Sequence, residues 1–257
     1  MSVLPPILAV TGLAAEARIA AGSGVMTVAG GGDPARLALL VQAALARGAR
    51  AVISFGIAGG LEPGLAPGSV VIARGVYDGA FRAATASAWV EGLAEVLPQA
   101  RVADIVGVDA AAAGVGDKAA LRRRTGAAAV DMESHVAARL AALHGLPFAA
   151  LRVVADPAER TLPPAALVGM RPDGRTDLGA VLRSLGRHPG QLAALVRTGL
   201  DARTAFLALE ASRRELHTLF GLGGVPREDG FDAATGLDFG IGTARVGSGD
   251  HAEFRAG

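Results

Sequence analysis

The chain of 257 residues contains no cysteine. This absence excludes disulfide bonds, thiolate nucleophiles and cysteine-based metal sites, and it fits a reducing cytoplasm. Lysine is nearly absent as well, because Lys118 is the only one and arginine carries almost all of the positive charge. The formal net charge is only +1, so no overall field attracts nucleic acid and we expect no nucleic-acid partner.

Long apolar runs are also missing, although 51% of the residues are hydrophobic and a sizeable core can form. The apolar stretches are short and punctuated, so we expect no transmembrane helix. The first residues, Met1 to Pro6, have no basic region before an apolar stretch and make a poor signal peptide. These features predict a cytoplasmic protein.

Metal-ligand spacing is absent among the five histidines. We interpret all of them as surface or helix-end residues and predict no metal site; they are His135, His144, His188, His217 and His251. The basic run Arg122–Arg124 is interpreted in the same way, as a solvated helix end in preference to a phosphate clamp.

Strand-like and helix-like segments alternate along the first two thirds of the chain. The predicted strands cover residues 7–10, 25–29, 51–55, 69–73, 101–106, 127–130 and 148–154. The predicted helices include 34–45, 87–97, 133–143, 178–185 and 192–219, and residues 162–176 are predicted as a loop. This alternation predicts an α/β fold, a single three-layer domain with a mostly parallel central sheet plus C-terminal helices. We place the domain at residues 1–220 and expect the glycine-rich segment 221–257 to be poorly ordered.

Two acidic residues stand where apolar runs stop. Glu133 follows the strand-like segment that ends at Val130, and Asp156 ends the run that begins at Phe148. In α/β sheets ligands bind beyond the carboxyl ends of the strands. One carboxyl group at that edge can hold a polyol and the other can transfer a proton, which suits cleavage of a bond between a sugar and a base.

Two glycine-rich turns and a third acidic residue are further candidates for the binding site, and each also has a purely structural explanation. The segment Gly56–Gly60 lets backbone approach a ligand, but it does not have the dinucleotide-binding spacing, and tight strand-to-loop packing explains it equally well. The segment Gly30–Arg36, with Gly32 and Arg36, is either an anion site at a helix start or a plain turn with a cap. Glu16 is either a site residue or a solvated first-turn glutamate.

Several motifs, in their order along the chain, resemble nucleoside phosphorylases and adenosylhomocysteine-type nucleosidases. They are residues 54–61 (SFGIAGGL), 65–72 (LAPGSVVI), 130–133 (VDME) and 152–156 (RVVAD). With the segments near Glu16 and at 161–164, the whole chain looks most like the hopanoid-associated phosphorylases. That resemblance implies adenosylhopane as the substrate, with adenine and a ribosyl- or phosphoribosyl-hopane as products.

The resemblance also implies roles for single residues. Glu133 would bind the ribose hydroxyls with Met132 packed against the sugar, and Asp156 would protonate N7 of the purine. Arg152 would steady the acid loop, and Glu16 would correspond to the carboxylate that activates water in hydrolytic members. By the same resemblance, the glycine-rich turns would supply further binding residues, with Ala58 and Gly59 at the substrate and Gly32 and Arg36 at the phosphate. The backbone near Ala110 and Ala111 would lie beside the base.

The chain departs from the nucleosidase motif at one position, and the sequence leaves the nucleophile and the substrate open. Ile57 stands where the nucleosidases have serine, so the nucleophile can be phosphate, as a co-substrate, or water. No other cofactor is predicted, and the resemblance implies a homo-oligomer. A hopane substituent implies an apolar groove or peripheral membrane contact near the helices at 178–219, although core packing or a subunit interface explains those helices as well. Rival functions are a methylthioadenosine-type nucleosidase, a non-catalytic nucleotide- or lipid-binding protein and, more weakly, an oxidoreductase.

Overall fold

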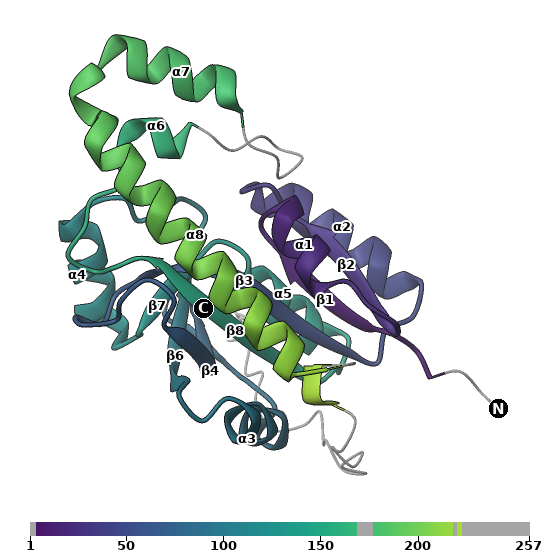
Figure 1. Cartoon of the computed structure of the whole chain (residues 1–257). Helices are drawn as coiled ribbons and strands as arrows, with labels where there is room; N and C mark the ends of the chain where they lie inside the picture. The colour runs from purple at the N-terminus through teal and green to yellow at the C-terminus, as the bar shows by residue number, and fades with distance from the viewer. Residues whose placement is uncertain (1–3, 169–176, 218–219, 223–257) are drawn as a thin grey trace, which may run out of the picture. The chain divides into compact units, whose positions relative to one another are not determined.

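An eight-stranded mixed sheet forms the centre of the computed structural model, which describes residues 4–168, 177–217 and 220–222 (Figure 1). Its strands are β1 (Ile7–Thr11), β2 (Val25–Ala29), β3 (Ala51–Gly60), β4 (Val70–Asp78), β5 (Phe81–Ala84), β6 (Arg101–Gly107), β7 (Ala129–Asp131) and β8 (Phe148–Asp156). The helices are α1 (Ala14–Ala20), α2 (Pro34–Ala46), α3 (Ser87–Val96), α4 (Val115–Thr125), α5 (Ser134–Leu143), α6 (Pro164–Leu167), α7 (Leu178–Arg187) and α8 (Leu192–Glu215), with a 3-10 turn at Pro189–Gln191. The α/β class predicted from the sequence is confirmed.

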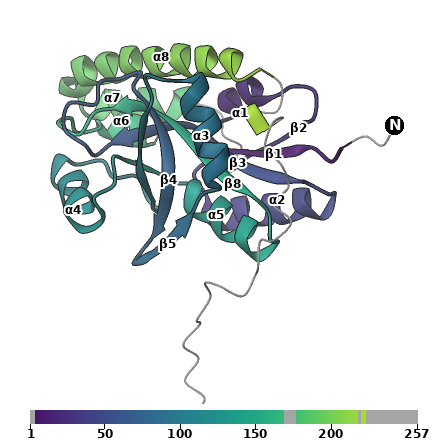
Figure 2. The ribbon, with the colours of Figure 1, turned by 90° about the horizontal axis from the view of Figure 1, so that it is seen from below.

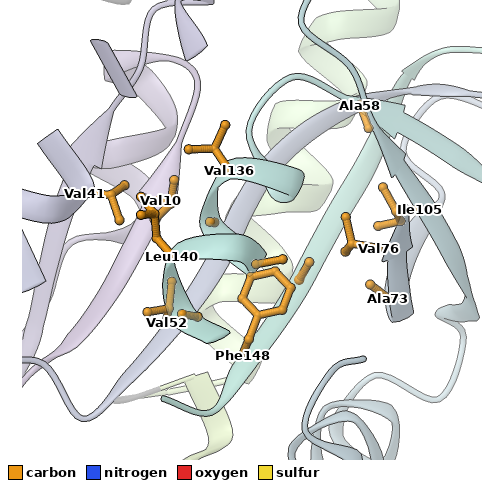
Figure 3. Close-up of a cluster of buried hydrophobic side chains, with 14 of the residues drawn as sticks. Val10, Val41, Val52, Ala58, Ala73, Val76, Ile105, Val136, Leu140 and Phe148 are labelled. Carbon is orange, nitrogen blue, oxygen red and sulfur yellow. The ribbon is translucent and has the colours of Figure 1, made fainter. Parts of the chain in front are cut away.

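Helices cover both faces of the sheet, because the strands carry apolar side chains on both sides. On β1, Leu8 and Val10 belong to a core with α2 and α5, whereas Ile7 and Ala9 belong to a second core with α3 and α8. Figure 3 shows part of the first core, and Figure 2 shows α8 on the opposite side of the sheet from α2 and α5. The result is three layers, as a doubly covered sheet requires.

The sheet closes partly on itself, which the sequence did not predict. Strand β3 pairs in parallel with β1 over Ala51–Ser54 and with β8 over Val52–Gly59, and its glycine-rich end, Gly59–Gly60, pairs antiparallel with β7. Strand β8 also pairs with β4, so that β3, β8, β4, β6 and β7 form a closed ring. The ring brings the end of β7 beside the ends of β3 and β8. The acids that follow β7 and β8 are therefore carried to one edge of the sheet.

Differences from the predicted elements are local. The short strand β5 pairs with β4 as a hairpin and was not predicted, and α6 lies inside the segment predicted as a loop. Helix α8 ends at Glu215, before the predicted limit of residue 219. Of the predicted tail 221–257, residues 223–257 lie outside the described residues, and so do residues 169–176 of the predicted loop. In the part of the chain that is described, no helix has the length and apolar character needed to cross a bilayer.

Candidate functional site

Arg152, in the middle of β8, is the buried charge around which the first half of the site is built. Its side chain is fully buried, so its charge must be compensated within the protein. Nε lies 2.6 Å from Oδ2 of Asp131, and Nη2 lies 3.4 Å from Oε2 of Glu133. Nη2 also donates to the Ser54 hydroxyl at 2.5 Å. Arg152 thus ties β8 to β3 and to the turn after β7.

The turn after β7 is held by the side chain of Asp131. Oδ1 of Asp131 accepts the backbone N–H groups of Glu133 at 3.2 Å and Ser134 at 2.9 Å, and Oδ2 accepts the Ser134 hydroxyl. Asp131 therefore satisfies donors at the start of α5, where Glu133 is the N-cap residue but makes no side-chain cap bond. The Glu133 side chain points to Gly12, where a Cβ would lie 2.6 Å from Oε1.

Glu16, on α1, joins the same cluster from the other side and is 1% exposed. Oε2 accepts the N–H groups of Gly12 at 2.8 Å and Leu13 at 2.7 Å, and Oε1 accepts that of Ile57 at 2.8 Å. A Cβ on Gly56 would lie 2.6 Å from Glu16 Oε1 and 2.8 Å from Arg152 Nη1. Glycine at 56 is therefore required by this close approach, which explains part of the glycine-rich segment.

Three carboxyl groups, those of Asp131, Glu133 and Glu16, share one guanidinium in this cluster, and the pKa values of Glu133 and Glu16 are raised. Burial raises the pKa of Glu133 to about 8; Arg152 opposes the rise, and the charges of Asp131 and Glu16 add to it. Burial also raises the pKa of Glu16, opposed by Arg152 and by the N–H donors. Carboxyl groups with raised pKa values at a strand edge are typical of functional sites.

Asp156, at the end of β8, belongs to a second charged pair. Its Oδ2 lies 2.5 Å from Nζ of Lys118, whose side chain is fully buried, while the Asp156 side chain is 16% exposed. Burial raises the pKa of Asp156, and the Lys118 ammonium group opposes that rise. The cation beside the acid is therefore Lys118. The expectation that Arg152 steadies this loop was wrong, because Arg152 faces the carboxyl groups of the other cluster.

The end of β3 connects the two charged centres. Gly56 lies against Glu16 and Arg152, and Gly59 lies against Asp156, where a Cβ would be 3.2 Å from Oδ2. Three residues of strand span roughly 10 Å, about the length of a ribose joined to a purine with a carboxyl group at each end. Ala58 is buried between them, and Ile57 and Gly59 are half-buried. The structure thus brings Glu133, Glu16 and Asp156 to one strand end.

The segment Gly30–Arg36 lies beside the end of β1, although it follows the second strand in the sequence. Gly31 donates its N–H to the Gly12 carbonyl at 2.8 Å, close to the contact of Gly12 with Glu133. Gly31 and Gly32 have φ values of 70° and 75°, which glycine adopts without strain. Arg36 donates to the carbonyl oxygens of Ala29 at 3.2 Å and Gly30 at 3.1 Å. Gly32 therefore belongs to the loop that borders Gly12, and Arg36, in the first turn of α2, contacts the start of that loop with its side chain.

The other predicted residues have mixed placements. Met132 is half-buried between Asp131 and Glu133, whereas Ala110 and Ala111 are exposed on the loop after β6. His135 is the second residue of α5, a helix-end position as predicted, but it is buried, with 3% of its surface exposed. Its Nε2 lies 3.0 Å from Oδ1 of Asp109 on the same loop.

Several residues of the two centres were missed from the sequence. Lys118 carried a signal, since it is the only lysine of the chain. Ser54 carried another, as a polar residue within the apolar strand β3. Asp131 stood next to Met132 and Glu133 in a motif already considered, but nothing in one sequence distinguished a turn-forming acid from a ligand-binding one.

A family model described as the Phosphorylase superfamily matches residues 9–185, more than half of the chain. No protein in the curated comparison set matches the sequence. The match includes β1 from Ala9 onward, the other seven strands and both charged centres.

Solved structures of nucleosidases have a similar fold. The 5′-methylthioadenosine/S-adenosylhomocysteine nucleosidase of Helicobacter pylori gives a TM-score of 0.58 at 14% identity, covering 84% of this chain and 100% of that one. Futalosine hydrolase of the same organism gives 0.57 at 16% identity, covering 82% and 98%. The S-adenosylhomocysteine nucleosidase of Streptococcus pyogenes gives 0.54 at 18% identity, covering 77% and 96%. At these identities the likeness concerns the fold.

Proposed function

Because the chain belongs to the phosphorylase superfamily, we propose that it cleaves the N-glycosidic bond of a purine nucleoside. The observation that carries the proposal is the placement of Glu133 and Asp156 at one strand end, each beside its own buried cation. Arg152 serves Glu133 and Lys118 serves Asp156, so the two acids can differ in protonation and in role. The solved nucleosidases with a similar fold support this choice of reaction.

Asp156 acts as the general acid in this proposal. As the bond between C1′ and N9 breaks, its electron pair moves into the purine, and the carboxyl proton of Asp156 moves to N7. Protonation turns a poor leaving group into a neutral base, and a positioned acid contributes ~10²–10⁴-fold to the rate. The raised pKa of Asp156, caused by burial, supports this role because it keeps a proton available nearer to neutral pH.

Glu133 holds the ribose in this proposal. Its carboxyl group accepts hydrogen bonds from the 2′- and 3′-hydroxyls, while the half-buried Met132 packs against the sugar. Positive charge develops on the ribose as the bond breaks, and it favours ionisation of Glu133 against the burial that raises the pKa of this carboxyl group.

We propose that water attacks C1′, with Glu16 as the carboxylate that orients the water and accepts the proton it loses as the C1′–O bond forms. Glu16 Oε1 accepts one N–H, from Ile57, and a carboxylate oxygen has room for a second donor. Phosphate is the alternative nucleophile, bound at Gly32 and Arg36 beside Gly12. Arg36 donates to loop carbonyl oxygens, which supports a role in shaping that loop.

The 5′ substituent that we propose is a hopane, which makes adenosylhopane the substrate. A large apolar substituent needs an apolar surface, and Leu178 and Leu182 on α7 are 68% and 67% exposed. Leu192, Val196 and Leu200 on α8 are also exposed, at 52%, 55% and 58%. Residues 178–200 contain three arginines and no acidic residue, which favours contact with an anionic membrane surface. A second copy of the chain would bring like charges together.

Vesicle binding tests this membrane contact. Leu178→Glu combined with Leu182→Glu should reduce sedimentation with phosphatidylglycerol vesicles at least fivefold. Leu39→Glu is the matched control, since Leu39 is equally exposed, at 68%, but lies on α2. Equal sedimentation of all variants, or dimerisation that the leucine substitutions abolish, would overturn it.

Release of adenine tests the proposed reaction. Adenosylhopane and methylthioadenosine are incubated side by side, in phosphate buffer and in phosphate-free buffer, and free adenine is measured by chromatography. The proposal expects release from adenosylhopane without phosphate, and loss of release in Asp156→Asn. If release depends strictly on phosphate, the nucleophile is phosphate and the proposal of water is wrong. If the enzyme prefers methylthioadenosine, the proposed hopane substituent is wrong. If adenine is released from neither compound although both bind tightly, the proposal that this protein is an enzyme is rejected.

A further inference from the structure

Lys118 is a fully buried lysine in a chain that otherwise uses arginine. Of the 25 lysine and arginine residues it is the only lysine, and it lies in the first turn of α4. Its Nζ lies 2.5 Å from Oδ2 of Asp156 and donates to the carbonyl oxygens of Pro157 at 2.9 Å and Arg160 at 3.0 Å. The Asp156 carbonyl oxygen lies at 3.4 Å as well, so four protein oxygens surround the three protons of the ammonium group.

The four oxygen atoms around Nζ all belong to Asp156 and the segment directly after it. Lys118 therefore fixes both the carboxyl group and the backbone that carries it. Arg160 is further held by an ion pair with Asp201 on α8, whose charge adds to the rise in the pKa of Asp156. Both contacts restrain the segment, but the Lys118 contact alone reaches the carboxyl group.

We propose that Lys118 is the positioning residue of the acid: it orients the Asp156 carboxyl group and stabilises the carboxylate that remains after the proton has moved to the leaving base. This inference rests on the proposed function. In the step itself the C1′–N9 bond breaks, its electron pair goes to the purine, and the Asp156 proton forms the N7–H bond. The carboxylate left behind is paired with the Lys118 ammonium group, which keeps all of its protons.

The chemistry at this position explains why a lysine stands here. An ammonium group is compact and donates in three directions, as the surrounding oxygens require, whereas a guanidinium group is planar and larger. A buried carboxylate without a partner is strongly disfavoured. Without Lys118, loss of the proton from Asp156 would be harder, so Asp156 would be a weaker acid at the moment of bond cleavage.

A comparison of two substrates separates this role from a purely structural one. The substrates are the adenosyl compound that the wild type cleaves and its N7-methylated derivative, whose base is already cationic and needs no proton. For Lys118→Met we expect kcat to fall about a hundredfold on the first and less than about threefold on the second. The alkaline limb of the pH profile on the first substrate should also move to higher pH.

Arg123→Met is the matched control, because it removes the same charge and introduces the same side chain on the exposed part of α4. It should change neither substrate's kcat by more than about twofold. Equal losses on both substrates in Lys118→Met would overturn the inference and leave Lys118 a structural residue. Absence of cleavage by the wild type would instead reject the proposed function.

A measurement on the unaltered side chain covers the case in which Lys118→Met does not fold. Labelling with lysine carrying ¹³C at the ε carbon gives one lysine signal, because the chain has one lysine. We expect the chemical shift of that signal to change in the wild type as Asp156 ionises, and we expect no such step in Asp156→Asn. Identical titration curves in the two proteins would show that the ammonium group does not sense the acid, and would overturn the inference.

Discussion

Replacement of Glu133 by glutamine should change how stability depends on pH. In the folded protein burial raises the pKa of Glu133 from its ordinary 4.5 to about 8. Between these two values the folded state binds more protons than the unfolded chain, so the free energy of unfolding falls as pH rises. The contribution is fully present below pH 4.5 and is lost as pH passes through about 8.

The magnitude follows from the width of this window. One pKa unit corresponds to about 1.4 kcal/mol, so the full loss is on the order of 5 kcal/mol. Glutamine has nearly the shape of the protonated side chain and does not titrate. Urea unfolding at pH 5, 6.5 and 8 should therefore show the wild type losing stability relative to Glu133→Gln by several kcal/mol across the range. Parallel curves for the two proteins would refute the idea that Glu133 is buried with an excess of neighbouring carboxyl groups.

Three further substitutions test the site. Asp156→Asn should lower kcat for adenine release at least ~100-fold with KM changed only a few-fold, and near-normal turnover would reject the acid role. Arg152→Leu leaves buried carboxyl groups without their cation and should cost about 3–5 kcal/mol in urea unfolding; a loss under about 1 kcal/mol would contradict the pairing. Gly12→Ala pushes the Glu133 carboxyl group aside, so kcat/KM for ribosides should fall roughly tenfold with little change in stability, and an unchanged kcat/KM would place the ribose elsewhere.

The strands and the acids at their ends could be predicted from the sequence, because both depend on local pattern. The buried strand β3 begins with the apolar run Ala51–Ile53, and Asp156 stands at the point where the run of β8 stops. The closure of the sheet could not be predicted, since it depends on the pairing of Gly59 and Gly60 with β7. That contact joins residues about seventy positions apart in the chain, and nothing in either segment encodes the other.

The ion-pair partners of the charged residues could not be predicted from the sequence either. Arg152 precedes Asp156 by four residues, and proximity in sequence favoured their pairing. Regular alternation along a strand would place residues four apart on the same face. The register shift of β8 against β3, between Val154 and Asp156, breaks that alternation, and the two side chains face different neighbours. Lys118 reaches Asp156 from 38 positions away in the sequence, which only the folded chain shows.

A crystal structure of the Asp156→Asn variant with a bound adenine nucleoside tests the central claim most directly. The account predicts N7 of the purine within hydrogen-bond distance of side chain 156 and both ribose hydroxyls at the carboxyl group of Glu133. A nucleoside bound at another surface, or one that touches only one of these two residues, would contradict it.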